Sequence, residues 1–176
     1  PVFFFFWIHV DGFMDTMDGI FSGRSRERML EIMKDSRVGA NGVTAFALFI
    51  LLKWSLFLDM PAAKLPAVLF LMPVIGRLVM VIGITAFPYA RPDGMRKAFA
   101  QHAGKTALLV AGIYTFGLVS IFGGAALLLC LAAVGAGLGI AGYISRKLGG
   151  LTGDAYGAIT ELTELVVLFL YALFFS

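Results

Sequence analysis

Three aspartates near the start of the chain have the spacing of a single helical face. The segment DGFMDTMDG places Asp11, Asp15 and Asp18 at positions i, i+4 and i+7, which share one side of an α-helix. Carboxylates stacked in this way repel one another unless a positive charge neutralises them, and Mg²⁺ prefers oxygen ligands of this kind. The triplet therefore predicts a magnesium site. The alternative is a helix N-cap at Asp11 followed by two solvated acids.

A second charged group follows the triplet. Lys34, Asp35 and Arg37 precede the glycines Gly39 and Gly42. A Lys-Asp-x-Arg cluster before a flexible turn is suited to grip a phosphate, with Asp35 as a further metal ligand. A solvated surface explains the same residues equally well, so both interpretations stay open.

Two loop motifs further along the chain add candidates for substrate binding. RPDG at 91–94 is a good turn sequence, and LGGLTGD at 148–154 combines close backbone approach at its glycines with side-chain oxygens. The residues predicted to bind substrate are Arg91, Asp93, Gly149, Gly150, Thr152 and Asp154.

Charged residues also occur inside apolar segments. Arg77 lies in the middle of AVLFLMPVIGRLVMVIGITAF, and an ionisable group at such a depth usually faces a bundle interior or a polar cavity. We predict that Arg77 faces such an interior or cavity, with a structural ion pair as the alternative. Lys53 is closer to the end of its segment and is expected to snorkel, whereas Glu161 and Glu164 are expected to form a polar stripe inside the bundle.

The elements that must position these residues are membrane helices. Sixty per cent of the 176 residues are hydrophobic and only 14% are charged, whereas soluble domains have about a quarter charged. The apolar segments, each near the roughly 20 residues that cross a bilayer, are 41–58, 67–87, 107–122, 124–144 and 158–175. We therefore predict an all-α polytopic transmembrane bundle, with about five full spans, as one integral-membrane catalytic domain over 1–176.

Three local features refine this architecture. Residues 1–10 resemble the end of a membrane helix, so we expect a fragment whose partial first helix continues upstream. The segment 24–42 carries an apolar stripe at Met29, Ile32 and Met33, which predicts a short amphipathic helix on the cytoplasmic membrane surface. The GxxxG formed by Gly135 and Gly139 favours close packing inside the bundle over a dimer seam, and homo-oligomerisation stays open.

The basic residues predict the topology. The connections 11–40, 88–106 and 145–157 together carry eleven Lys and Arg, whereas 59–66 carries one and the turn at Gly123-Gly124 carries none. By the positive-inside rule the rich side is cytoplasmic, and all the candidate loop motifs fall on it. The net charge of +3 is modest and does not indicate a nucleic-acid partner.

The segments 9–43, 91–94 and 148–158 resemble the cobalamin synthase family, the adenosylcobinamide-GDP ribazoletransferases, and the resemblance covers the whole chain in order. Typical members have further N-terminal helices. The resemblance implies that α-ribazole, or its 5′-phosphate, reacts with adenosylcobinamide-GDP to give adenosylcobalamin, or its phosphate, and GMP. It also implies Mg²⁺ dependence and a bacterial or archaeal inner membrane.

The chemistry implied by this family gives the charged residues their expected roles. Mg²⁺ held by the aspartate triplet would bridge the pyrophosphate, and Asp18 is the candidate general base. Lys34, Arg37 and Arg77 would offset phosphate charge, since phosphoryl transfer depends on positioning and charge neutralisation.

Two other functions share some of these features with the ribazoletransferases. A CDP-alcohol phosphotransferase also has an Asp-rich motif and Mg²⁺, but its pattern needs Ala-Arg where this chain has Asp15-Thr16. A cation transporter would place its acids near the membrane midplane, whereas these lie at the interface. ATP hydrolysis is not indicated, because the chain has no Walker-type GxxxxGK[ST] motif.

Overall fold

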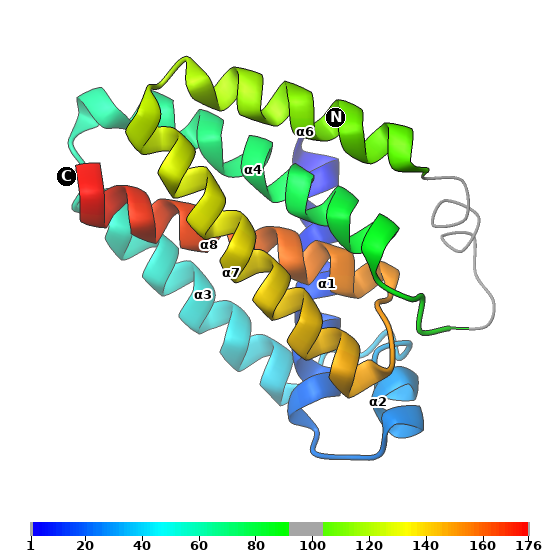
Figure 1. Ribbon diagram of the computed structural model, residues 1–176. Helices are drawn as coiled ribbons and strands as arrows, with labels where there is room; N and C mark the ends of the chain where they lie inside the picture. Colours follow the sequence, from blue (N-terminus) through cyan, green and yellow to red (C-terminus); the bar gives the residue numbers. More distant parts are fainter. Residues whose placement is uncertain (1, 92–103, 176) are drawn as a thin grey trace.

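The computed structural model describes residues 2–91 and 104–175, and these are mostly α-helical (Figure 1). The helices are α1 (Val2–Phe21), α2 (Arg26–Ile32), α3 (Ala40–Leu58), the 3-10 helix η1 (Ala62–Lys64), α4 (Leu65–Ala86), α6 (Lys105–Ser120), α7 (Gly124–Leu148) and α8 (Gly153–Phe175). The predicted all-α bundle is confirmed. Each of the five predicted apolar segments corresponds to one helix, with ends that differ by at most a few residues.

Four of the described helices are long and apolar enough to cross a membrane. They are α3, α4 together with η1, α7 and α8, and α6 is a shorter apolar helix of 16 residues. The chain is therefore a multi-pass membrane protein.

The helices α3, α4, α6, α7 and α8 run up and down, so their connections gather at two ends (Figure 1). The segment between α1 and α3, the residues after α4 and the α7–α8 loop lie at one end, which we call the loop end. The turn after α6 and η1 lie at the other. This arrangement matches the alternation predicted from the basic residues. The hairpin break also falls where expected, because Gly123 adopts a φ of 89° directly before α7.

Helix α8 is the centre of the bundle, packed against α1, α3, α4 and α7. Two glycines let α1 cross α8 almost backbone to backbone. A Cβ on Gly12 would lie 2.9 Å from the Cα of Asp154, and one on Gly157 would lie 3.0 Å from the carbonyl oxygen of His9. The crossing therefore sets the aspartate face of α1 beside the start of α8.

The amphipathic segment differs from its prediction. Helix α2 has only seven residues, begins after the N-cap Ser25 and ends well before residue 42. Met29 and Met33 are buried in a cluster with Ile20 and Leu148. Its apolar side packs on the protein interior and not on lipid, because the chain between α1 and α3 folds back over the end of α7.

The GxxxG prediction for α7 is also corrected. Gly137 provides the close approach, since a Cβ there would lie 2.6 Å from the Thr163 hydroxyl oxygen and 2.8 Å from Val79. Gly135 and Gly139 have no neighbouring atom within 4 Å of a Cβ position in the described structure. Gly135 and Gly139 are exposed and lie on a different side of α7 from the buried Gly137.

Candidate active site

Carboxylates from two helices meet at the loop end. Asp11 and Asp15 lie on the face of α1 that crosses α8, and Asp154 is in the first turn of α8. Arg91, which follows α4, brings its Nη2 atom to 3.2 Å from Oδ2 of Asp154. Asp15 lies within electrostatic range of Asp11, Asp154 and Arg91, and these four residues carry more negative than positive charge. We call these four residues the acid cluster.

Asp15 shows the effect of this crowding. It is half-buried at the polar half of α1, outside the four long apolar spans. Burial, followed by the charges of Asp11, Asp154 and Asp18, raises the pKa of Asp15 to about 7, and the charge of Arg91 opposes this shift. A carboxyl group held in this way favours either a proton or a cation.

Backbone contacts between two loops hold Arg91 next to Asp154. Leu151 donates its N–H to the Pro88 carbonyl at 2.8 Å, and Ala90 donates to the Leu151 carbonyl at 2.9 Å. Gly150 makes this approach feasible with a φ of 147°, because a Cβ there would lie 2.7 Å from the Pro88 oxygen. No local sequence pattern indicates that these two distant loops pair. The sequence analysis therefore predicted Arg91 and Asp154 as binding residues but did not predict that they contact each other.

The remaining residues of LGGLTGD shape the loop. Gly149 ends α7 in the left-handed conformation, with the Arg26 guanidinium packed against it. The buried Thr152 hydroxyl accepts a hydrogen bond from the Ala155 N–H at 3.1 Å, as an N-cap does. The substrate contacts predicted for Gly149, Gly150 and Thr152 stay predictions, and the one predicted for Asp93 lies outside the described residues.

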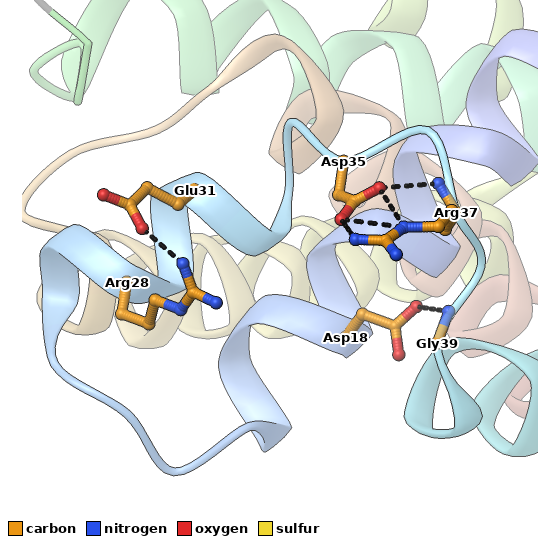
Figure 2. A network of polar contacts seen from close by, with 6 residues as sticks. All are labelled: Asp18, Arg28, Glu31, Asp35, Arg37 and Gly39. Atoms are coloured by element: carbon orange, nitrogen blue, oxygen red, sulfur yellow. Dashed lines mark hydrogen bonds and ion pairs between the residues drawn. The ribbon is translucent and has the colours of Figure 1, made fainter.

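Asp18 is on the same helix but in a different environment. Asp18 is 7% exposed. Its Oδ2 accepts the N–H of Gly39 at 2.8 Å (Figure 2), and its Oδ1 accepts that of Gly42 at 2.8 Å. Both oxygens of Asp18 are therefore engaged by the N-terminus of α3.

The Lys34 to Arg37 segment lies beside Asp18 (Figure 2). Asp35 accepts two hydrogen bonds from the Arg37 Nε, at 3.0 and 3.2 Å, and one from its Nη2 at 2.7 Å. These bonds lower the pKa of Asp35 to about 2. Asp35 therefore meets Arg37 and not the acid cluster, and Lys34 is exposed.

Arg77 belongs to a separate group of charges in the middle of the bundle. Its Nη1 atom is 3.9 Å from Glu164 on α8, ten residues beyond Asp154 and so about 15 Å along the helix. Lys53 on α3 reaches Glu161 at 3.3 Å and Glu164 at 3.7 Å. Lys53 is thus paired across helices and does not snorkel, while the predicted stripe of Glu161 and Glu164 is confirmed. We call these four residues the central ion network.

The predicted Mg²⁺ site requires acidic side chains that converge on one point. Among residues 2–91 and 104–175, no three His, Cys, Asp or Glu side chains converge closely enough to hold an ion by themselves. The predicted set of Asp11, Asp15, Asp18 and Asp35 is not brought together. The acid cluster still has the right chemistry, because Mg²⁺ commonly takes one or two carboxylates and completes its sphere with waters and substrate phosphates.

The site and fold together define a multi-pass membrane protein with a carboxylate-rich centre at one end of its helices. A family model described as cobalamin-5-phosphate synthase matches residues 2–172. The chain is 44% identical to the adenosylcobinamide-GDP ribazoletransferase of Desulforamulus reducens, over 94% of this chain and 67% of the relative. It is 41% identical to the enzyme of the same name from Acetivibrio thermocellus, over 95% of this chain and 68% of the relative.

A third relative with that name, from Desulfitobacterium hafniense, is 43% identical over 92% of this chain and 66% of its own length. The chain thus spans about two thirds of the length of these curated relatives. No solved structure matches it. The chain belongs to the cobalamin-5-phosphate synthase family, and the resemblance predicted from its sequence is confirmed, together with the transferase function of that family.

Proposed function

We propose that this chain joins adenosylcobinamide-GDP to α-ribazole, or to its 5′-phosphate, with Mg²⁺, at the cytoplasmic face of a bacterial or archaeal inner membrane. The observation that carries the proposal is the acid cluster, which sits at the loop end in a chain of this family. The basic loops support the cytoplasmic side, since eleven of their twelve Lys and Arg belong to the connections predicted for that end.

The reaction is a phosphoryl transfer. A ribose hydroxyl oxygen of the ribazole, other than the 5′ oxygen that carries the phosphate in ribazole 5′-phosphate, would form a bond to the phosphorus that carries the corrinoid. The bond from that phosphorus to the bridging oxygen would break, and GMP would leave with this oxygen. The hydroxyl proton would pass to a carboxylate of the acid cluster. Positioning and neutralisation of charge supply most of the catalysis in reactions of this type.

The residues divide these tasks. Mg²⁺, when bound, would neutralise developing charge on the pyrophosphate oxygens, and Asp11, Asp15 and Asp154 are the residues that would hold it. Without the ion, burial and its acidic neighbours raise the pKa of Asp15 to about 7, so Asp15 is the carboxyl group of the cluster that is the candidate base. Among the described residues, Arg91 Nε is buried without a hydrogen-bond partner, so this guanidinium has a donor available for a phosphate oxygen.

The test uses membranes that contain the full chain. They are incubated with adenosylcobinamide-GDP, α-ribazole and Mg²⁺, and the products are identified by mass. Formation of GMP together with a cobalamin, and its loss when Mg²⁺ is chelated, would support the proposal. Release of GMP without a cobalamin would show hydrolysis, and would contradict the proposed acceptor.

A further inference from the structure

We infer that Asp18 is a positioning residue, which caps α3 from a distance and thereby fixes the segment of residues 33–38 that leads into this helix and carries Lys34 and Arg37. This inference rests on the proposed function for its effect on catalysis, but its structural part stands on contacts alone. It separates Asp18 from Asp11 and Asp15, although all three share the spacing of one helical face.

The need for a cap arises at the start of α3. The first N–H groups of a helix have no partner within the helix, and they are normally satisfied by a Ser, Thr, Asp or Asn at the N-cap. Here the N-cap is Gly39, which has no side chain to do so. Gly39 and Gly42 stand at the N-cap and N3 positions, the two places that a capping box satisfies reciprocally.

Asp18 satisfies both positions with one carboxylate. Oδ2 accepts from Gly39 and Oδ1 from Gly42, each at 2.8 Å, across 21 and 24 residues of chain. The negative charge also suits the positive end of the helix dipole. The carboxylate is only 7% exposed, so the bonds are shielded from competing water.

The two glycines are shaped to admit this carboxylate. A Cβ on Gly42 would lie 2.5 Å from Oδ2 of Asp18 and 2.8 Å from the Met14 carbonyl oxygen, and one on Gly39 would also collide with the carboxylate. Neither glycine has a positive φ, so space for Asp18, and not backbone conformation, is what requires glycine at these positions.

The two hydrogen bonds from Gly39 and Gly42 to Asp18, which we call the clasp, also hold the neighbouring segment. Residues 33–38 run from the end of α2 directly into Gly39, and Figure 2 shows Asp18 beneath Asp35 and Arg37. Asp18 acts electrostatically on Asp15, so the clasp lies close to the acid cluster. When these two hydrogen bonds are lost, the segment that carries Lys34 and Arg37 loses its anchor at Gly39.

The experiment compares Asp18→Ala and Asp18→Asn with Asp11→Asn in the full chain, by site-resolved amide hydrogen exchange. In Asp18→Ala we expect exchange at the Gly39 and Gly42 amides to rise at least about tenfold, as for loss of a hydrogen bond to a charged group. Asp18→Asn keeps one acceptor oxygen and should be intermediate. Asp11→Asn should leave these amides unchanged. Unchanged exchange in Asp18→Ala would overturn the inference.

Kinetics provide the second readout. Asp18→Asn should raise the KM for adenosylcobinamide-GDP while the Mg²⁺ concentration for half-maximal activity stays at the wild-type value. Gly42→Ala keeps the Asp18 carboxylate but places a methyl group in the space that it occupies. This variant should raise the KM and the exchange of the Gly39 amide, as Asp18→Asn does. A shift in Mg²⁺ dependence equal to that of Asp11→Asn would make Asp18 a metal ligand and refute the positioning role. A chain without transferase activity would refute the proposed function, and the exchange result would still decide the cap.

Discussion

The acid cluster and the central ion network are both built around α8, but they differ in charge balance. The acid cluster sets Asp11, Asp15 and Asp154 against Arg91 alone, whereas the central ion network pairs Lys53 and Arg77 with Glu161 and Glu164. The central ion network has equal numbers of positive and negative groups, although Arg77 Nη1 is buried without a hydrogen-bond partner among the described residues. The unbalanced group is costly unless a cation or proton joins it, so the imbalance marks the site that receives a ligand.

This comparison predicts opposite effects for neutral substitutions in the two regions. Loss of a charge from the central ion network should lower stability and leave the chemistry of the folded protein intact. Loss of a charge from the acid cluster should lower activity and leave the protein stable.

The largest effect on stability is expected for Glu161→Gln. The Glu161 side chain is 3% exposed and contacts Lys53 at 3.3 Å, and removal of one partner from a buried pair leaves the other charge uncompensated. We expect a loss of about 3 kcal/mol in the free energy of unfolding, measured by thermal denaturation of the purified protein in detergent. Turnover per folded molecule should stay near the wild-type value.

A double variant provides the control for Glu161→Gln. Lys53→Met combined with Glu161→Gln restores charge balance and should recover most of the lost stability. If Glu161→Gln abolished turnover without any loss of stability, the central ion network would belong to the active site and the comparison would fail.

The largest effect on activity is expected for neutral variants of the acid cluster. Asp11→Asn, Asp15→Asn and Asp154→Asn should each lose at least about a hundredfold in kcat/KM, as for loss of a charge-stabilising group, which corresponds to about 2.7 kcal/mol. Amounts in the membrane should stay near wild type, because Asn is isosteric.

Metal titration then assigns the roles within the acid cluster. Raised Mg²⁺, or Mn²⁺ in its place, should partly rescue a variant that lost a ligand, but not one that lost the general base. Normal turnover of all three variants in limiting Mg²⁺ would show the cluster to be a solvated helix end.

A smaller effect is expected for Arg77→Leu, which tests where the boundary between the two regions lies. The Arg77 side chain is 41% exposed and 3.9 Å from Glu164, so its loss should reduce stability by about 1 kcal/mol or less. If Arg77 has only a structural role, the activity per folded molecule of Arg77→Leu should equal that of the wild type. An inactive variant that accumulates normally in the membrane would instead place Arg77 with the substrate, as the sequence predicts.

The helices and the approximate site could be predicted because they depend on local properties. Apolar length identifies the spans, and the spacing of Asp11, Asp15 and Asp18 places them on one face of α1. The partners of those residues depend on contacts between distant parts of the chain. Asp18 meets Gly39 only because the 22–38 segment folds back, and Arg91 meets Asp154 only because Gly150 lets the loop at Pro88 approach closely.

The same limit explains the errors. Met29 and Met33 have the periodicity of a membrane-surface stripe, and periodicity cannot distinguish lipid from the side of a neighbouring helix. Lys53 was assigned by its depth alone, whereas its actual state follows from two glutamates more than a hundred residues away.

The smallest effects are expected at the exposed pair of Asp35 and Arg37. The pKa of Asp35 is lowered to about 2, so the pair stays charged on both sides throughout an assay near neutral pH and is lost only as the pH falls toward that value. Because both side chains are solvated, neither Arg37→Ala nor Asp35→Ala should change the thermal stability measurably.

If the segment binds a phosphate, Arg37→Ala should raise the KM for adenosylcobinamide-GDP a few-fold with little change in kcat. Asp35→Ala, which releases the guanidinium from its partner, should leave this KM unchanged or lower it. Equal KM values in the wild type and both variants, measured at low ionic strength where surface charges act most strongly, would make the pair a solvated surface feature. The phosphate-binding task would then fall to Arg91 within the acid cluster.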